Sequence, residues 1–315
     1  MKLDKIAILI PCFNESQTIK EVITGFKEVL PEATVYVYDN NSSDNTSELA
    51  KEAGAIVKYE YQQGKGNVIR RMFREIDAEC YLLVDGDATY PPDAARSMVD
   101  LLFEKNVDMV VGDRLSSTYF NENKRPFHNF GNSLVRSSIN FLFKSNIRDI
   151  MTGYRAFSYE FVKTFPVLSK GFEIETEMSI HAIDKNMLVE NIIIDYRDRP
   201  KGSVSKLNTY SDGIKVIKTI FSLFRTYKPL EFFGSVSVLL IALAICFFVP
   251  IFIKYLQSGT VPNFPTLIVC GFSMIAGLIS FFSGLILSSI KQKNLQDFEM
   301  ELHKAYRDKM SKRFE

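Results

Sequence analysis

The sequence has few of the residues that build disulfide frameworks or structural metal sites. Its four cysteines form no CxxC pair, and its three histidines show no metal-ligand spacing. A structural zinc site is therefore excluded, and reduced thiols in a cytoplasmic setting are expected. The N-terminal apolar run is too short for a signal peptide and has no A-x-A site, so the N-terminal part is expected to stay in the cytoplasm.

Two common nucleotide-binding motifs are also missing. No GxGxxG follows the first predicted strand, which argues against a classical dinucleotide fold. Gly64-Lys65-Gly66 lacks the spacing of a phosphate-binding P-loop.

The near-zero net charge of +1 hides a strong asymmetry along the chain. Residues 199–228 carry seven basic groups and one acidic group, whereas residues 232–253 carry no charge. Charge alone would allow the basic segment to bind nucleic acid. Its apolar face and the uncharged run that follows favour a membrane partner and no nucleic acid.

The first third of the chain alternates short β-branched runs with longer amphipathic stretches, as in a parallel sheet with crossover helices. Strands are predicted at 6–10, 34–38, 55–59, 81–84 and 108–111. Helices are predicted at 16–30, 44–53, 66–77 and 92–104, with another near 132–143. The pattern indicates an α/β domain with a Rossmann-like, mostly parallel sheet over residues 1–207, in which residues 112–207 complete the substrate-facing side.

The C-terminal third is predicted to associate with a membrane. An amphipathic juxtamembrane helix is predicted at 208–230, although an ordinary buried helix has a similar pattern. Two transmembrane helices are predicted at 231–254 and 265–290, each long enough to cross a hydrocarbon core about 30 Å thick. A C-terminal amphipathic helix is expected at 291–315. Basic residues before the first span and after the second place both termini in the cytoplasm.

The second span carries two pairs of small residues spaced four apart, Ser273/Gly277 and Ser280/Gly284. Such pairs let another helix approach closely. They are compatible with a homo-oligomer through the transmembrane helices and equally with packing of the two spans as a hairpin.

Polar clusters follow the first four predicted strands, at 11–15, 39–41, 62–66 and 85–87. In an open parallel sheet, ligands bind beyond the carboxyl ends of the strands. Asp85 and Asp87 lie two residues apart on a tight turn and offer hard oxygen ligands to Mg²⁺ or Mn²⁺, which share their coordination shell with substrate phosphates.

Several of these motifs together resemble a known family. They are Ile10-Pro11-x-x-Asn14-Glu15, Asp39 with its Asn-Asn-Ser-Ser-Asp-Asn-Thr continuation, Gly64-Lys-Gly-Asn67, Asp85-Gly-Asp87 and Thr152-Gly-Tyr-Arg-Ala-Phe157. The chain resembles the GT-A glycosyltransferases of family 2 over about residues 5–210. Within that family it is similar to the branch of dolichyl-phosphate mannose synthase and bacterial undecaprenyl-phosphate sugar transferases.

The resemblance implies inverting transfer of one sugar from a nucleotide-sugar, UDP-glucose or a UDP-N-acetylhexosamine, to polyprenyl (undecaprenyl) phosphate at the cytoplasmic membrane face. The residues implied in donor binding are Pro11, Asn14, Glu15, Asp39, Asn41, Lys65, Asp85 and Arg114. Those implied in binding the acceptor phosphate are Arg125, Arg155, Arg199, Ser203, Ser205 and Lys206. Asp85 and Asp87 would hold the metal. Asp87 and Asp149 are the expected catalytic residues; Asp149 could instead pair with Arg155, and Glu175 is a second candidate for an orienting or base role.

Thr89 stands where mannose synthases often have glutamine, so the resemblance extends neither to a third protein ligand nor to mannose. Two other functions remain open at this point. A processive polysaccharide synthase needs tryptophan in its Gln-x-x-Arg-Trp motif, and the chain has none. A non-catalytic membrane scaffold that only binds nucleotide-sugars is disfavoured by the Asp85/Asp87 pair.

Overall fold

The computed structural model describes residues 3–114, 140, 147–171, 173–195, 221–222 and 224–314. The chain divides into two units. One comprises Met1–Asp212 together with Phe298–Glu315, and the other comprises Gly213–Asp297.

The first unit is built on a seven-stranded mixed sheet with the order β3-β2-β1-β4-β6-β5-β7. Its strands are β1 (Asp4–Cys12), β2 (Thr34–Asp39), β3 (Ile56–Tyr59), β4 (Ala78–Leu83), β5 (Met109–Asp113), β6 (Arg155–Ser158) and β7 (Val189–Ile193). All neighbouring pairs are parallel except those of β6, which runs antiparallel to β4 and β5. The predicted α/β class and mostly parallel sheet are confirmed.

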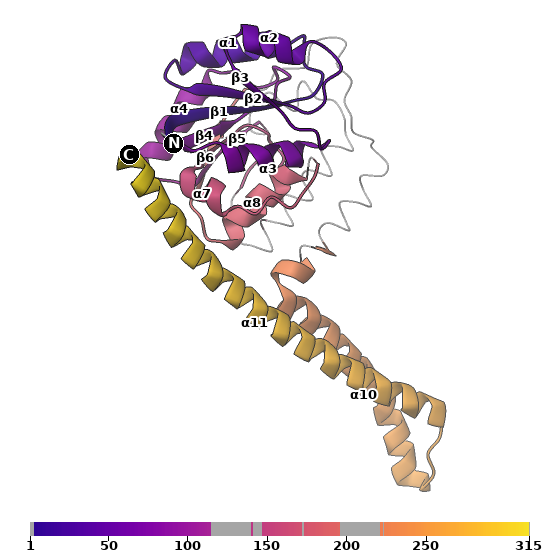
Figure 1. The fold of residues 1–315 in the computed structure, drawn as a ribbon. Helices are drawn as coiled ribbons and strands as arrows, with labels where there is room; N and C mark the ends of the chain where they lie inside the picture. Colours follow the sequence, from indigo (N-terminus) through magenta and orange to yellow (C-terminus); the bar gives the residue numbers. More distant parts are fainter. Residues whose placement is uncertain are drawn as a thin grey trace. The chain divides into compact units, whose positions relative to one another are not determined.

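Helices cover both faces of this sheet (Figure 1). They are α1 (Ile19–Val29), α2 (Thr46–Glu52), α3 (Lys65–Glu75), α4 (Ala94–Glu104), α7 (Tyr159–Thr164) and α8 (Ile174–Asp184). Alternate residues of β1 point to opposite faces: Ile6, Ile8 and Ile10 join the core that α1 and α4 cover. On the other side, Phe73 of α3 packs edge-on against Tyr81 and Phe157. From Ile6 to Ile10, β1 is apolar and buried, because both of its faces are covered.

The predicted first helix begins too early. Helix α1 starts at Ile19 with Thr18 as its N-cap, whereas the sequence predicts a start at Ser16. The backbone N–H of Ser16 donates to Asp44 at 3.2 Å, and that of Glu15 donates to Thr46 at 2.9 Å. These contacts hold residues 13–18 as a loop against the start of α2. The predicted helix near 132–143 lies outside the described residues apart from Asn140, which is helical.

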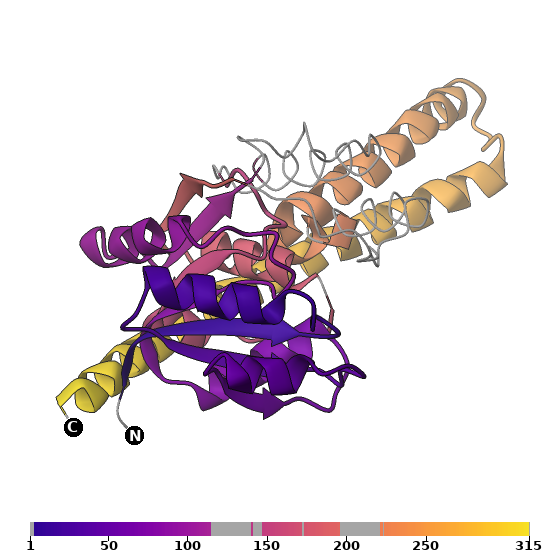
Figure 2. The ribbon, with the colours of Figure 1, turned by 90° about the horizontal axis from the view of Figure 1, so that it is seen from above.

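The second unit contains α10 (Pro229–Ser258) and most of α11 (Phe264–Phe314), which run side by side in both views (Figures 1 and 2). Both helices are long and apolar enough to cross a membrane. Helix α11 is 51 residues long and continues unbroken through residue 290, so the expected C-terminal helix at 291–315 is its extension. Of the predicted juxtamembrane helix at 208–230, only residues 221–222 and 224–230 are described.

Small residues of α11 face α10. A Cβ on Gly277 would meet the side chain of Ile241 at 2.8 Å, and one on Gly284 would meet Phe233 at 3.1 Å. Between them, the hydroxyl of Ser280 donates to the carbonyl of Phe233 at 2.9 Å. The small-residue face therefore serves packing within the hairpin of one chain.

Candidate active site

The site forms at the carboxyl ends of the central strands. After β1 the chain moves outward to β2 and β3, and then returns to β4 on the other side of β1. The switch point of the sheet therefore lies between β1 and β4, which is where ligands bind in folds of this kind. Cys12 at the end of β1 is the sheet partner of Asp39 at the end of β2. The turn with Asp85 and Asp87 follows β4.

Lys65, at the start of α3, bridges two carboxylates. Its Nζ lies 2.5 Å from Oδ1 of Asp85 and 2.6 Å from Oε1 of Glu175 on α8. The side chains of Lys65 and Glu175 are buried, whereas that of Asp85 is 27% exposed. Burial opposes the charged form of Lys65, but the two carboxylates outweigh it and raise the pKa of the ammonium. The lysine therefore stays charged at neutral pH.

Two glycines allow the backbone to approach closely around Lys65. A Cβ on Gly64 would overlap the carbonyl of Lys170, and one on Gly66 would overlap that of Ser169. Gly64 also has a φ of +129°, which side chains rarely adopt. The Gly-Lys-Gly motif thus brings the segment before α8 against the start of α3, where Lys65 meets Glu175.

Asp87 is buried and held within its own turn. Its Oδ1 accepts hydrogen bonds from the hydroxyl of Thr89 at 2.6 Å and from the backbone N–H of Thr89 at 3.2 Å. Ala88 between them has a φ of +58°. The carbonyl of Gly86 accepts from Thr18 at 2.6 Å, which ties the turn to the start of α1. Thr89 therefore orients Asp87.

The buried thiol of Cys12 shows that the strand-end carboxylates converge. Burial raises the pKa of this thiol well above its ordinary value, and the charges of Glu15, Asp39, Asp85 and Asp87 raise it further. Four of the predicted site residues thus act on one point at the end of β1. A region of concentrated negative charge suits a cation.

Asp39 is buried and supports the loop that follows it. Its Oδ1 accepts from the backbone N–H of Ser42 at 2.8 Å, and its Oδ2 accepts from the hydroxyl of Ser47. Asn14 and Asn41 both have left-handed backbones, with φ of +56° and +65°. The side chain of Asn14 accepts from the backbone N–H of Ser43 at 2.8 Å, so the loops after β1 and β2 are joined.

Asn40 lies in the predicted polar cluster at 39–41, but only its neighbours Asp39 and Asn41 were predicted as site residues. Its side-chain amide donates to the carbonyls of Glu60 and Gln62, both at 2.8 Å, and its Oδ1 accepts from Gly64 at 2.7 Å. The position of Asn40 beside the predicted Asn41 was the indication in the sequence that it belongs to the site. Through these hydrogen bonds, Asn40 fixes the loop that leads into Lys65.

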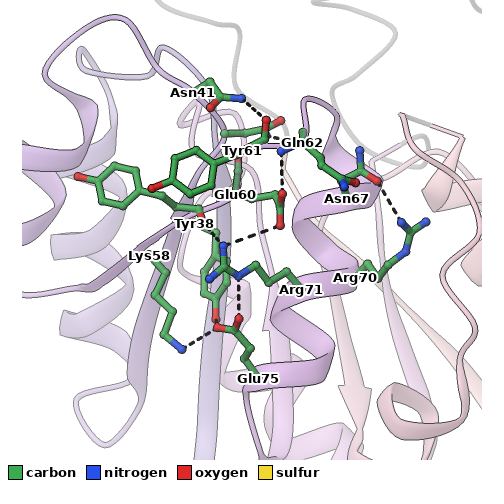
Figure 3. Close-up of polar contacts among 12 residues, drawn as sticks. Tyr38, Asn41, Lys58, Glu60, Tyr61, Gln62, Asn67, Arg70, Arg71 and Glu75 are labelled. Carbon is green, nitrogen blue, oxygen red and sulfur yellow. Dashed lines mark hydrogen bonds and ion pairs between the residues drawn. The ribbon is translucent and has the colours of Figure 1, made fainter.

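A second network braces the same loop from the side of α3 (Figure 3). Glu75 accepts from Tyr38 at 2.9 Å, from Lys58 at 2.7 Å and from Arg71 at 2.7 Å. Although partial burial opposes ionisation, these donors lower the pKa of Glu75 to about 2. Arg71 lies 3.9 Å from Glu60, so the network reaches the loop before α3.

Arg114 and Asp149 form a buried pair beside the switch point. The guanidinium Nε donates to Oδ2 at 2.8 Å, and the backbone N–H of Met151 donates to Oδ1 at 3.2 Å. The Arg114 guanidinium also lies 3.4 Å from the hydroxyl of Tyr90, which accepts from the backbone N–H of Gly153 at 3.0 Å. The charged side chain that pairs with Asp149 is therefore that of Arg114, and the alternative pairing with Arg155 is wrong.

Arg155 is fully buried in the sheet. It donates to the carbonyls of Thr152 at 3.0 Å and Ile150 at 2.6 Å, and to the hydroxyl of Ser179 at 2.9 Å. Burial lowers the pKa of its guanidinium to about 10. Arg155 therefore supports the structure, and we do not retain it as a contact of the acceptor phosphate. The other residues predicted for that role lie outside the described residues: Arg125, Arg199, Ser203, Ser205 and Lys206.

Within the described part of the chain, no group of three or more His, Cys, Asp or Glu side chains could hold a metal by itself. Asp85 and Asp87 supply two oxygen ligands on one turn, and the side chain of Asp85 is partly exposed. This donor set fits Mg²⁺ or Mn²⁺, which commonly combine one or two carboxylates with waters and substrate phosphates.

Comparison with known proteins agrees with this architecture. The sheet order, the carboxylate turn at the switch point and the similarity to solved structures define a GT-A-type glycosyltransferase fold. The chain belongs to glycosyl transferase family 2, whose model matches residues 7–165. Glycosyltransferase AglJ of Haloferax volcanii is 35% identical over 74% of this chain and 77% of its own length.

More distant matches extend the comparison. The dolichyl-phosphate beta-glucosyltransferase of Saccharomyces cerevisiae is 25% identical over 68% of this chain and 72% of its own length. A crystal structure of glucosyl-3-phosphoglycerate synthase from Mycobacterium tuberculosis superposes with a TM-score of 0.56 at 19% identity, over 70% of this chain and 79% of that one.

Proposed function

We propose that this glycosyltransferase moves one sugar from a UDP-sugar to polyprenyl phosphate at the cytoplasmic face of a membrane. The observation that carries the proposal is the combination, in one chain, of converging carboxylates at the switch point with two helices able to span a membrane. A lipid-linked acceptor would explain why a soluble-type catalytic fold is joined to such helices.

The relatives and structural neighbours support the substrate classes. A relative from Haloferax volcanii, 25% identical over 69% of this chain, is named dolichyl-phosphate hexose transferase. One solved structure of the mycobacterial synthase contains Mn²⁺, uridine diphosphate and glucosyl-3-phosphoglycerate. We infer a UDP-sugar donor, UDP-glucose or a UDP-N-acetylhexosamine, and undecaprenyl phosphate as the lipid in bacteria.

The residues divide the chemistry between binding and charge compensation. Asp85 and Asp87 would hold a divalent cation, which stabilises the negative charge of the departing diphosphate. Pro11, Glu15 and Asp39 would line the pocket for the base and ribose, together with the loops that Asn14 and Asn41 shape. Lys65 would donate to the diphosphate, and Arg114, held by Asp149, would define the wall beside Tyr90.

The acceptor needs little activation, because a phosphate monoester with a second pKa of about 6 is mostly ionised at neutral pH. Its oxygen attacks the anomeric carbon as the bond to the diphosphate breaks, and the electron pair of that bond leaves with UDP. In-line attack inverts the anomeric centre. The work of the chain is therefore placement of the two substrates and compensation of charge.

The same reasoning gives a topology. We infer that residues 231–254 and 265–290 span the membrane, with both termini on the cytoplasmic side and residues 208–230 lying along its surface. Labelling of single introduced cysteines in intact cells tests this arrangement. A residue between the spans should react with an impermeant reagent, and one after residue 291 should not.

The decisive test is transfer by the purified full-length protein in detergent. We expect radiolabel from at least one UDP-sugar to enter an organic-extractable lipid when undecaprenyl phosphate and Mg²⁺ or Mn²⁺ are present. Omitting the lipid should abolish the signal. Absence of lipid-linked product with every donor and either metal would refute the proposed function.

A further inference from the structure

The carboxylate that the proposed function assigns to a metal is already bound to a cation of the chain. Oδ1 of Asp85 lies 2.5 Å from the ammonium of Lys65. The same carboxylate occupies the space beside Gly153, where a Cβ would overlap Oδ2. Asp85 is therefore held between a backbone on one side and a charged lysine on the other.

We propose that Lys65 and the divalent cation compete for Asp85, and that Glu175 is the positioning residue that keeps the ammonium when the cation displaces it. This inference rests on the metal role in the proposed function. It adds a role for Lys65 before the donor arrives and a reason for Glu175 to lie behind it.

The charges around Asp85 explain why the chain supplies its own cation. Glu15, Asp39, Asp85 and Asp87 all act on the thiol of Cys12, so their mutual repulsion is concentrated at the end of β1. A lysine against Asp85 offsets part of this repulsion whenever no divalent cation is bound. A divalent cation would supply the same compensation and must replace the Lys65 contact to reach Oδ1.

Glu175 lowers the energetic cost of displacing Lys65 from Asp85. Its Oε1 lies 2.6 Å from Nζ of Lys65, and its side chain is only 6% exposed. A buried ammonium left without a partner is strongly unfavourable. With Glu175 in place, Lys65 can release Asp85 and still keep a carboxylate partner, and the N–H donor that Asp85 had accepted from becomes available to an anionic diphosphate.

A thermodynamic consequence follows. The cation should bind weakly to the free protein, because it must displace Lys65. It should bind more tightly with UDP, whose diphosphate both ligates the cation and accepts hydrogen bonds from the released lysine. Binding of the cation and binding of the nucleotide then favour each other by the same factor.

The experiment measures Mn²⁺ binding to the nucleotide-free, full-length protein by electron paramagnetic resonance. In Lys65→Met the competitor is gone, and we expect free-protein Mn²⁺ affinity to rise about fivefold or more. Lys105→Met is the matched control, because Lys105 is also ion-paired, at 2.7 Å, but with Glu190, and neither residue belongs to the site. It should leave Mn²⁺ affinity unchanged. Unchanged or weaker Mn²⁺ binding by Lys65→Met would overturn the proposal.

A double-mutant cycle tests Glu175 separately. In Glu175→Gln the ammonium loses one of its carboxylate partners and holds Asp85 more tightly, so free-protein Mn²⁺ binding should weaken severalfold. If Glu175 acts through Lys65, this effect should disappear when Glu175→Gln is combined with Lys65→Met. An equal effect in both backgrounds would refute the positioning role. These readouts need no sugar transfer, so they fail independently of the assay of the proposed function.

Discussion

Arg114 and Asp149 lie 35 residues apart in sequence and form a nearly buried ion pair with Nε and Oδ2 at 2.8 Å. Asp149 also accepts hydrogen bonds from the backbone N–H groups of Arg114 and Met151. A carboxylate whose oxygens are engaged in this way is suited to hold a guanidinium and poorly suited to accept a proton in catalysis.

Replacing Asp149 therefore tests structure against catalysis. Asp149→Asn removes the negative charge from a buried ion pair with Arg114, so we expect the free energy of unfolding to fall by about 3–5 kcal/mol. Activity should fall together with the folded fraction. Denaturant unfolding monitored by circular dichroism, alongside transfer assays, measures both. A variant with wild-type stability and no turnover would instead identify Asp149 as a catalytic base.

Asp87 is predicted to be indispensable for turnover. Asp87→Asn keeps the hydrogen-bonding shape toward Thr89 and removes one negative oxygen ligand, so we expect turnover to fall about a thousandfold. Asp93→Asn is the control, because Asp93 is an exposed carboxylate six residues further along. Single-turnover transfer assays provide the comparison. Full activity in Asp87→Asn would remove the metal role of this residue.

Gly153 sets the place of the Asp85 carboxylate. A Cβ at this position would overlap Oδ2 of Asp85, so Gly153→Ala should push the carboxylate away and reduce activity at least tenfold. At Gly171 a Cβ would meet only the flexible end of Glu173, so Gly171→Ala should be nearly neutral. Thermal unfolding checks that both variants fold. Equal activity of the two would show that Asp85 tolerates displacement.

Strands β1, β2, β3, β4 and β5 were each predicted within about three residues. For the central strands the reason is burial on both faces, which needs nearly continuous apolar runs, as in β4 and β5. The edge strand β3 is partly exposed and was predicted from its β-branched residues Ile56 and Val57. Strand β6 was not predicted. It has four residues, begins with a buried arginine and pairs with β4, where Ser158 is opposite Cys80. Such a strand is specified by distant partners, and local sequence carries little sign of it.

The candidate site divides in the same way. Positions after strands could be predicted, because topology brings strand ends together whatever the side chains are. The burial of individual side chains could not be predicted. Arg155 was therefore assigned to the acceptor phosphate from its motif, which matches the family, although its side chain lies buried in the sheet. Asn40 and Gly153 act through contacts with Gly64 and Asp85, which are remote in sequence.

His181 on α8 makes the catalytic unit sensitive to acid. Its ring packs against Phe161, Phe165 and Phe298, and burial, aided by Lys185 and opposed by Asp184, lowers its pKa to about 4. Between pH 6.5 and 4, His181 is protonated in the unfolded chain and neutral in the folded chain. The free energy of unfolding therefore decreases as the pH is lowered from 6.5 to 4.

The decrease in the free energy of unfolding caused by His181 should reach up to about 3 kcal/mol at pH 4. It should be absent in His181→Leu, so the stability of that variant should depend less on pH between 6.5 and 4. The exposed His303 provides the control variant His303→Leu, which should keep the wild-type slope. Urea unfolding at several pH values measures these slopes. The same slope in His181→Leu as in the wild type would contradict the assignment.

The C-terminal end of α11 braces the strand that carries the carboxylate turn. Lys312 lies 3.0 Å from Asp77, which directly precedes β4, and Arg313 lies 3.3 Å from Glu79 within it. Lys309 contacts both oxygens of Glu160 at 3.0 Å. These contacts all fall within the catalytic unit, so the last turns of α11 belong to its fold.

Reversing one of these charges should therefore destabilise the catalytic unit. Lys312→Glu would set a carboxylate against Asp77 and Asp308, and we expect a loss of about 2 kcal/mol, seen as a lower unfolding temperature. Lys304→Glu is the matched control, because Lys304 is exposed and its ion pair is with Glu301 on the same helix. If the single reversal and the control unfold at the same temperature, the end of α11 contributes nothing to holding β4, and the carboxylate turn depends on the sheet alone.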